Sequence, residues 1–578
     1  MHKNLYIDYQ QVRAKNFQVI LDDYLVKDRR TLLYNKKYYQ NLPNYFWDKQ
    51  KVKQKDVLKI DKLKKEIFIY LVKKLEIIHS EKFTKKYWEI ILLPWLDSII
   101  PKIFHYWKIT SSLDKKLFGH LYKFNGIDFI KNSFYEVGYY NNLDFNRWIL
   151  SELIIYQNKT TYKQKKSKAK NQIQIFTKIS FFKNILKSFF KFFSLFFNSR
   201  IMIDSIQISK LDYILLNLKL KQFPFFWFRE DIKEHKIDFK KREKLSGKNY
   251  NKKNLSTFIK KNLIYLVPKN YLENFKSIKS SSEKNYWPKK PKIIITSLSY
   301  WFDDFFKIWV AGKTLIKTKY IIMQHGGKMA TEKVSTNMSV QIQLADKYLT
   351  WGWNDKNKKV TPYFSMLLSN IHNQNNYIKK KTICFCQSVF PNYFNHIDGL
   401  PILFKDKITY TESANIIYEK LQDIHKKNFL LRFLKKQNDK VNSYHKLIIN
   451  KNISHDDSKK KFQSLIKDVR IFIHNQDSTT FLETLAANVP TIVVLKKDYL
   501  NNIKSSSKKL YLALEKEKII FHNSEKAAKF INLNYDKIDN WWESKSTQKA
   551  KAAFCKRFAN KNENFLSELT NFLKNLCN

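Results

Sequence analysis

Cysteine is scarce in this chain of 578 residues, which contains only Cys384, Cys386, Cys555 and Cys577. Four cysteines do not make a disulfide framework in a chain of this length, so a small disulfide-bonded scaffold is excluded. Cys384 and Cys386 are two residues apart on an expected strand, which is not the usual spacing of a zinc-binding pair. Glycine and proline are also few, at 9 and 11 residues.

Long apolar runs are absent as well. No segment of transmembrane length is free of charged residues. Residues 1–10 lack the apolar core of a signal peptide. We therefore expect a cytoplasmic protein.

Acidic residues are too few to balance the basic ones: 51 Asp and Glu face 107 Lys and Arg, which gives a net charge of +56. A drift of composition toward Lys, Asn, Ile, Phe and Tyr explains this charge without any function. The functional alternative is attraction to an anionic membrane surface or to nucleic acid. No RRM, KH or zinc module is visible, so we expect no specific nucleic-acid partner.

Familiar catalytic loops are missing too. The sequence has no Walker-type phosphate loop, no zinc motif and no G-x-S-x-G nucleophile elbow. We therefore expect neither a bound metal nor a cofactor. A phosphate site in this chain has to come from helix starts and basic side chains.

What is present indicates two or three domains. Residues 1–160 are aromatic-rich with helical spacing, and residues 161–290 are basic and serine-rich, as in an insertion or linker. Residues 291–375 and 376–578 alternate strand and helix. This pattern predicts an α/β fold of two Rossmann-like, doubly wound domains, the first using parts of residues 1–160. The helical tail from residue 524 is expected to pack back on the first domain. The expected strands are 292–298, 320–324, 347–351, 382–389, 429–433, 469–474, 491–495 and 519–522.

The segment 176–198 combines lysines at every fourth position with a wide aromatic face. Its spacing predicts a helix with a narrow basic stripe. Three interpretations fit this pattern: a core helix with one wet edge, an interfacial membrane helix, and a helix that docks on a partner protein.

Two strand ends carry most of the candidate site residues. The strand that starts at residue 320 runs into Gln324, His325, Gly326 and Gly327. Two glycines let the backbone approach a ligand closely, and exposed N–H groups suit a phosphate or carboxylate. His325 can act as acid or base near neutral pH. A plain turn with an exposed histidine explains the same residues without function.

The second strand end follows residues 469–474 and opens a helix. His474 closes the strand, and the helix starts at Ser478, Thr479 and Thr480 with Glu483 one turn further on. Ser or Thr at a helix start caps free N–H groups, and a nearby Glu completes such an arrangement, which is the structural explanation. The functional one uses the same geometry, because a helix start with hydroxyl groups binds phosphate.

Arg432 lies at the end of a third strand, 429–433. The fork of a guanidinium fits a diphosphate. A solvated arginine is the alternative.

Several patches occur in the order found in a known family. On these residues the chain resembles the transferases of bacterial surface-carbohydrate biosynthesis, which look like two-domain GT-B glycosyltransferases. The resemblance covers most of the chain beyond residue 40, except residues 160–290. The patches are Tyr87-Trp88 with Pro94-Trp95-Leu96, Gln324 to Gly327, Asp346 with Thr350 to Trp353, Ser478 to Glu483 with Asn488 to Thr491, and Trp541-Trp542.

Two departures from the family are visible in the sequence. The glycine pair continues as Lys328-Met329-Ala330 instead of an aromatic-glycine pair, and the extra N-terminal strand region of many members is not expected here. Either departure points to an altered acceptor site or to reduced activity.

The resemblance implies an enzyme that moves a sugar or related group from a nucleotide-activated donor to a glycan or lipid-linked acceptor of surface polysaccharide or lipopolysaccharide. The basic surface and the helix near residues 181–197 would place it peripherally on the inner membrane face. The implied site residues are His325 and Glu483 for catalysis, Arg432, His474, Ser478, Thr479 and Thr480 for the donor, and Gln324, Gly326 and Gly327 for an acceptor or phosphate loop.

Other classes stay open. A basic protein that binds nucleic acid or membrane without catalysis fits the charge and the aromatic residues. A sugar epimerase or a polyol-phosphate transferase fits the same scaffold, because fold does not fix function.

Overall fold

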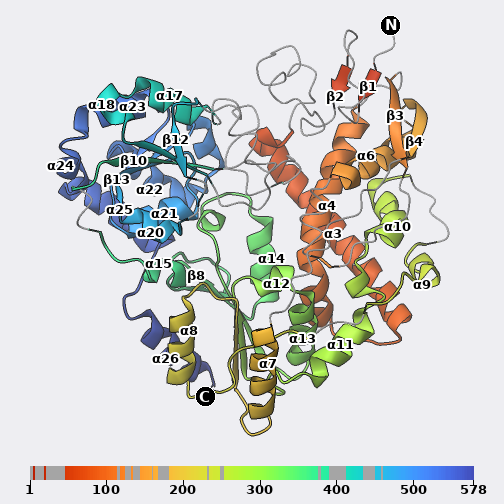
Figure 1. The fold of residues 1–578 in the computed structure, drawn as a ribbon. Helices are drawn as coiled ribbons and strands as arrows, with labels where there is room; N and C mark the ends of the chain where they lie inside the picture. Colours follow the sequence, from red (N-terminus) through yellow and green to blue (C-terminus); the bar gives the residue numbers. More distant parts are fainter. Residues whose placement is uncertain are drawn as a thin grey trace.

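The structure is a computed structural model of the chain. It describes residues 46–112, 143–158, 181–230, 234–247, 253–374, 379–388, 412–433, 450–456 and 460–577, the strands at 4–6, 18–20, 117–123 and 160–166, and residues 132–133, 397, 410 and 458. Figure 1 shows a helical region on the right, a central parallel sheet, and a second sheet domain on the left.

The helical region is built on α3 (Gln50–His79), α4 (Lys85–Ser111) and α6 (Leu143–Gln157). Ile60, Ile67 and Leu71 of α3 are fully buried at helical spacing with exposed lysines between them, as the sequence predicted. Two prolines, Pro94 and Pro101, lie inside α4, and the helix continues through both. Burial of this helix on nearly all sides offsets the backbone hydrogen bond that a proline removes.

Four strands in the N-terminal region form a parallel sheet. They pair in the order β2-β1-β3-β4, so the strand region that the sequence did not predict is present. Its strands were missed because β4 is rich in lysine and has no apolar alternation. The strands are β1 (Asn4–Tyr6), β2 (Gln18–Ile20), β3 (Leu117–Lys123) and β4 (Thr160–Lys166).

The central sheet contains five parallel strands in the order β5-β6-β7-β8-β9. Alternate residues of its isoleucine-rich strands are buried on opposite faces. One face packs towards α13 (Asp304–Thr314), which lies against α4, and the other is covered by α8 (Lys210–Lys219) and α26 (Phe565–Cys577). The strands are β5 (Ile201–Asp204), β6 (Ile293–Thr296), β7 (Lys319–Met323), β8 (Lys347–Thr350) and β9 (Val360–Pro362).

The second sheet has six parallel strands in the order β12-β11-β10-β13-β14-β15. The chain starts in the middle, at β10, builds outward to β12, and then returns to build the other half from β13. This is the strand order of a dinucleotide-binding Rossmann sheet, with its reversal between β10 and β13. The strands are β10 (Thr382–Gln387), β11 (Phe429–Phe433), β12 (Ser454–Asp456), β13 (Val469–His474), β14 (Thr491–Val494) and β15 (Ile520–Phe521).

Each strand expected between residues 292 and 522 is present, and the α/β class with two Rossmann-like, GT-B-like parallel sheets and a helical N-terminal region is confirmed. The tail from residue 524 was expected to pack back on the first domain, and only its last helix does so. Helices α23 (Ser524–Asn534) and α25 (Lys545–Phe558) stay with the second sheet, and α26 returns to the first. There Lys292 donates to the Cys577 carbonyl at 2.6 Å.

The stretch 161–290 was expected to be an insertion or linker, and its described part contradicts this. It contributes β5 to the central sheet, and α10 (Leu255–Leu266) and α11 (Phe275–Lys284) pack on the helical region. In α11, for example, the buried Phe275 and Ile278 are separated by Lys276 and Ser277, so local composition hid them.

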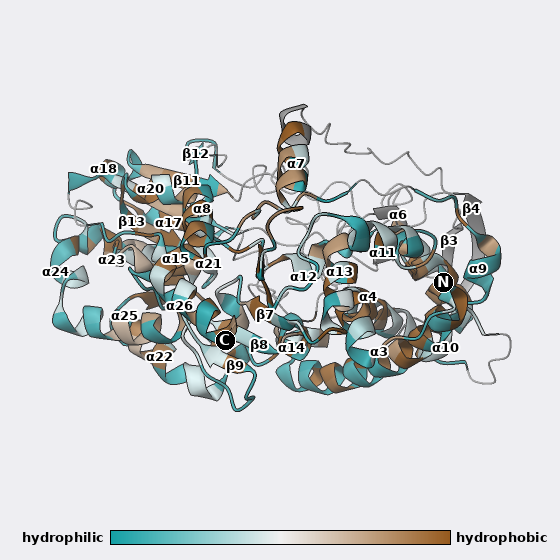
Figure 2. Cartoon of the chain, turned by 90° about the horizontal axis from the view of Figure 1, so that it is seen from below, coloured by the Kyte–Doolittle hydropathy of each residue, from teal (hydrophilic) through white to brown (hydrophobic). Residues whose placement is uncertain are grey.

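The aromatic segment forms α7 (Phe181–Phe193), which projects from the body of the protein in Figure 2. Phe190 is buried, but Phe189, Phe192 and Phe196 are exposed. A core helix with one wet edge is therefore excluded.

Candidate functional site

The second sheet has its reversal of strand order between β10 and β13. In open α/β sheets, ligands bind outside the carboxyl ends of the strands at such a switch point. There the Ser388 N–H donates to Asn475 Oδ1 at 3.0 Å, which ties the two strand ends together. The chain then enters α21 (Thr479–Ala486), so the start of this helix lies at the switch point.

The glycine loop after β7 is held rigidly from one side. Gln324 is buried, and its Oε1 accepts from the Trp353 indole at 2.7 Å and from the Trp351 N–H at 3.0 Å. Its Nε2 donates to the Gly326 carbonyl at 2.6 Å. With its amide used in this way, Gln324 shapes the loop, and its place in an acceptor or phosphate site stays a prediction.

The structure brings the two predicted motifs together although they are 152 residues apart. The Gly327 N–H donates to Thr479 Oγ1 at 3.4 Å, across the boundary between the two sheet domains. A Cβ at Gly327 would lie 2.3 Å from Leu482 Cδ1, whereas one at Gly326 would meet only Met329 Cε at 3.9 Å. Glycine is thus needed at 327 for close approach to α21.

His325 lies in the same loop and is partly buried. Its ring stacks on Trp301, with ring centroids 6.5 Å apart, and also approaches Tyr300. Burial lowers the pKa of His325 to about 4, so the ring is neutral at physiological pH. Among the residues that the structure describes, the buried Nδ1 has no hydrogen-bond partner, so it can still accept one from a ligand group.

The start of α21 is uncapped. Ser478 occupies the N-cap position, but its side chain makes no capping hydrogen bond and instead lies 3.4 Å from Thr480 Oγ1. The structural explanation of these hydroxyls as helix caps therefore fails for Ser478. Ser478, Thr479 and Thr480 are all partly exposed. Free N–H groups and hydroxyls at a helix start are suited to an anion.

Glu483 lies one turn into α21 and is buried. Among the residues that the structure describes, its carboxylate has no hydrogen-bond partner. Burial raises its pKa to about 7, and the positive charge of Arg432 opposes this rise only in part. A buried carboxyl that is half protonated near neutral pH both donates and accepts hydrogen bonds, and perturbed groups of this kind gather at functional sites.

Arg432 and His474 are less available than the sequence suggested. Both are level with Cys386 of β10 at the carboxyl edge, so the three side chains share one face of the sheet. Arg432 forms an ion pair with Asp456 and donates to the Lys460 carbonyl at 2.8 Å. His474 is buried, its Nε2 lies 3.2 Å from Thr484 Oγ1, and burial lowers its pKa to about 3. The contact with Thr484 lets His474 position α21, and a direct contact of His474 with a donor stays a prediction.

A polar cluster beside the site was missed by the sequence analysis. Asp477, directly before Ser478, is buried and accepts hydrogen bonds from the Tyr499 hydroxyl at 2.9 Å and the Tyr511 hydroxyl at 2.5 Å. Burial raises the pKa of Asp477, and the nearby Lys328 opposes this. The only sequence signal was an acid at a strand end. Nothing in the sequence pointed to tyrosines so far along the chain.

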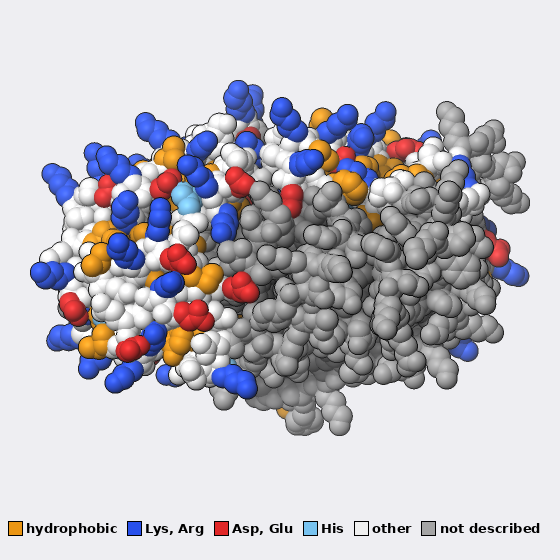
Figure 3. Space-filling model, turned by 90° about the horizontal axis from the view of Figure 1, so that it is seen from above, with side chains coloured by type: hydrophobic (Ala, Val, Ile, Leu, Met, Phe, Trp, Pro, Cys, Tyr) orange, Lys and Arg blue, Asp and Glu red, His pale blue; other side chains and the backbone are white. Residues whose placement is uncertain are grey.

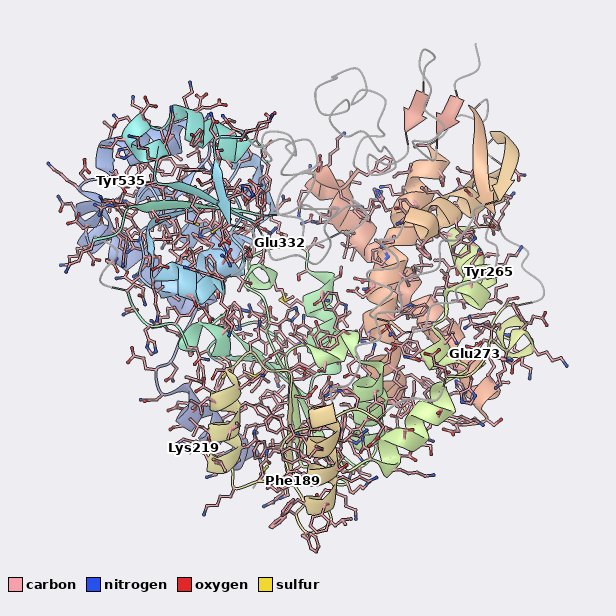
Figure 4. The ribbon with its side chains drawn as sticks, viewed as in Figure 1. Phe189, Lys219, Tyr265, Glu273, Glu332 and Tyr535 are labelled. Carbon is pink, nitrogen blue, oxygen red and sulfur yellow. The ribbon has the colours of Figure 1, made fainter. Side chains whose placement is uncertain are left out.

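The altered segment Lys328-Met329-Ala330 is part of the contact between the two domains. Lys328 pairs with Glu332 at 2.7 Å and lies over the Tyr499 ring at 5.1 Å. The next residues form an antiparallel bridge between Glu332 and Ile503. Figure 4 places Glu332 between the two sheet domains. Residues 328–333 and 499–504 thus connect the two sheet domains.

Within the described residues, no group of three or more His, Cys, Asp or Glu side chains could hold a metal ion. The same part of the chain contains no helix that is long and apolar enough to cross a membrane. The chemistry available at the site is therefore an uncapped helix start, a buried glutamate and a neutral histidine on a facing loop.

The sequence model described as the LIC12162 family transferase matches residues 8–573. The chain therefore belongs to this family of transferases. A search of the curated proteins gave no match.

Several solved structures are similar to the chain. The wall teichoic acid polymerase TagF is 11% identical, with 65% of this chain and 88% of that chain covered and a TM-score of 0.35. MnaA of S. aureus, solved with UDP, is 10% identical over 52% and 78%, with a TM-score of 0.32. MurG of Acinetobacter baumannii is 11% identical over 52% and 78%, with a TM-score of 0.29.

Proposed function

We propose that this transferase moves a sugar, or a related group, from a nucleotide-activated donor to a glycan acceptor in the synthesis of bacterial surface polysaccharide or lipopolysaccharide. The observation that supports this best is the contact between Gly327 and Thr479. It sets the glycine loop of one sheet against the helix start that follows the switch point of the other. A reaction between two bound substrates needs two such sites facing each other.

In this proposal the donor occupies the switch point of the second sheet. The uncapped N–H groups of α21 and the hydroxyls of Ser478, Thr479 and Thr480 hold the diphosphate. Glu483 hydrogen-bonds a ribose or sugar hydroxyl. Arg432 acts through its charge on Glu483, because its own donors are engaged by Asp456 and a backbone carbonyl.

His325 acts on the acceptor. The acceptor hydroxyl gives its proton to Nδ1 while its oxygen attacks the donor carbon, and the bond from that carbon to the diphosphate breaks. The negative charge that develops on the leaving diphosphate is stabilised by the helix start. A bound anion also raises the pKa of His325, which makes the ring a better base in the complex than in the free protein.

The acceptor is a glycan or a lipid-linked glycan, so the enzyme works on the cytoplasmic side and peripherally at the inner membrane face. In the proposed mechanism, every step uses only groups of this chain, without a metal ion or a resident cofactor.

A thermal-shift screen against UDP-, GDP-, CMP-, CDP- and dTDP-linked donors tests the proposal. A ligand that binds only the folded protein raises its melting temperature. We expect one nucleotide class to raise it, and the shift to disappear in the triple variant Ser478→Ala, Thr479→Ala and Glu483→Gln. The control variant is Glu563→Gln, at an exposed glutamate of the tail.

The screen, together with an assay of nucleotide-sugar conversion, separates the competing functions. Conversion of a nucleotide sugar without any acceptor would indicate an epimerase, and a shift only with CDP-linked polyols would indicate a polyol-phosphate transferase. No shift with any donor, or a shift that survives in the triple variant, would refute donor binding at α21.

A further inference from the structure

Helices α7 and α8, at the lower edge of the protein in Figure 1, carry many exposed apolar side chains. Nine of the eighteen large apolar side chains that are exposed in the described residues lie between Ile185 and Leu218. Six belong to α7 and the turn after it: Ile185, Phe189, Phe192, Leu195, Phe196 and Phe197. Three belong to α8: Leu211, Leu215 and Leu218. We name these nine side chains the α7–α8 face.

The α7–α8 face is fixed to the body of the protein. Phe190 of α7 is buried among Phe223, Phe225 and Phe228, with ring centroids 5.4 to 6.3 Å away. Tyr213 of α8 contacts Phe225 from the other side, at 6.3 Å. Both helices therefore rest on one aromatic base, and the exposed side chains are presented by ordered helices.

Basic side chains accompany the α7–α8 face. Lys191, Lys210, Lys219 and Lys221 are exposed along α7 and α8. Of the acidic groups nearby, Glu230 pairs with Lys187 at 2.7 Å and Asp212 accepts from the Ser209 hydroxyl at 2.6 Å. Figure 4 shows Phe189 on α7 and Lys219 on α8, both at the lower edge of the protein. Exposed apolar and exposed basic side chains therefore occur together along the same two helices.

Positive charge alone does not mark this surface. Figure 3 shows Lys and Arg side chains spread over the visible face of the second sheet domain, as a net charge of +56 requires. What distinguishes the α7–α8 face is its set of exposed aromatic and aliphatic side chains. A helix with bulky apolar residues on one side and lysines at the boundary fits the headgroup region of a bilayer, where it lies in the plane of the interface.

Charge decides which partner fits. A second copy of this chain would bring the exposed lysines of two α7–α8 faces together, and the repulsion between these charges opposes such a dimer. A nucleic acid satisfies the lysines but leaves Ile185, Leu195 and the α8 leucines in water. An anionic lipid surface satisfies both, since headgroups attract the lysines and acyl chains cover the apolar side chains.

We propose that the α7–α8 face binds the anionic lipid surface of a membrane and holds the transferase there. Such binding would account for the proposed location at the inner membrane face. The inference rests on the proposed function only for the reason why the protein would need to bind a membrane. Lipid binding by these residues can be measured in the absence of a donor and an acceptor.

Vesicle sedimentation of the full-length protein tests the proposal. The test variant is Phe192→Glu, Leu195→Glu and Phe196→Glu. The matched control is Ile424→Glu, Leu512→Glu and Leu533→Glu, which changes three exposed side chains of the second domain and removes the same net charge. The vesicles are pure phosphatidylcholine, or a mixture with phosphatidylglycerol.

We expect the wild type and the control variant to bind the phosphatidylglycerol vesicles, and the test variant to bind them at least about tenfold more weakly. Binding to pure phosphatidylcholine should be much weaker for all three proteins. Since all substituted side chains are exposed, far-UV circular dichroism should show that each protein is folded.

Three results would overturn the proposal. One is equal loss of lipid binding in the test and control variants, because net charge alone would then explain binding. Another is a wild-type dimer by light scattering that becomes a monomer in the test variant. The third is RNA binding that exceeds lipid binding and is lost in the test variant.

The donor-site variant Glu483→Gln keeps the two proposals separate. It should bind vesicles as the wild type does, so a failure of donor binding leaves lipid binding intact. The test variant in turn should keep its thermal shift with the donor.

Discussion

Replacement of Glu483 by glutamine should stabilise the protein at neutral and alkaline pH. The pKa of the buried carboxyl rises from its ordinary value of 4.5 to about 7, so the folded state retains a proton that the unfolded state loses. Stability therefore falls as the pH rises from 4.5 to 7, and the full cost remains above 7. One pKa unit corresponds to ~1.4 kcal/mol, so the cost is roughly 3 kcal/mol.

Glutamine has the same shape but no charge at any pH. We expect Glu483→Gln to be more stable than the wild type by roughly 3 kcal/mol at pH 8, and by less than about 1 kcal/mol at pH 5. Urea unfolding of both proteins across this pH range, followed by far-UV circular dichroism, gives the difference. Glu563→Gln, at an exposed position, should show no such trend.

A difference that does not change with pH would refute the reasoning, and so would a variant that is less stable at pH 8. Either result would mean that the carboxylate has a native partner that compensates its burial. The expected result would show a residue that weakens the fold while it is kept for another purpose, as in many functional sites.

Three further predictions concern the contact between the domains and the facing loop. Gly327→Ala should destabilise the protein by about 1–3 kcal/mol and weaken donor binding, because its Cβ overlaps a leucine of α21, whereas Gly326→Ala should be tolerated; thermal unfolding with and without donor measures both. Tyr511→Phe should cost about 1–3 kcal/mol in urea unfolding, because it removes a hydrogen bond from the buried Asp477; an unchanged midpoint would contradict this. His325 should give no inflection near pH 6.5 in kcat/KM, because burial lowers its pKa to about 4 in the free protein; an inflection that His325→Gln abolishes would contradict this.

The sheets were predictable because parallel strands buried on both faces leave a strong signal. Each is a short, nearly continuous apolar run such as Ile293–Thr296 or Val469–His474, bounded by polar residues. The strand ends also marked the site, since both predicted loops lie at carboxyl edges. The contact between Gly327 and Thr479 follows from the domain arrangement, which no local pattern encodes.

The features that the sequence analysis missed depend on contacts between residues that are distant in the chain, or lie in segments whose polar composition masks a strand. Asp477 became interpretable only when Tyr499 and Tyr511 were seen to bond it. Arg432 and His474 were assigned to a donor from their positions at strand ends, but tertiary contacts with Asp456 and Thr484 engage them. Strand β4 was overlooked because lysines dominate its sequence.

The return of α26 to the central sheet has a consequence for how the protein is made. Ile293, Ile295 and Ile321 lie on the face that α26 covers, yet more than 240 residues separate them from Phe565. At a ribosomal rate of ~5–20 residues per second, that gap takes on the order of tens of seconds to synthesise. During this interval the first sheet exposes the part of its apolar face that α26 covers in the finished protein, so a chaperone that shields it should raise the yield of folded protein. The second sheet completes its core before α26 is synthesised, and the core of the first sheet is completed last.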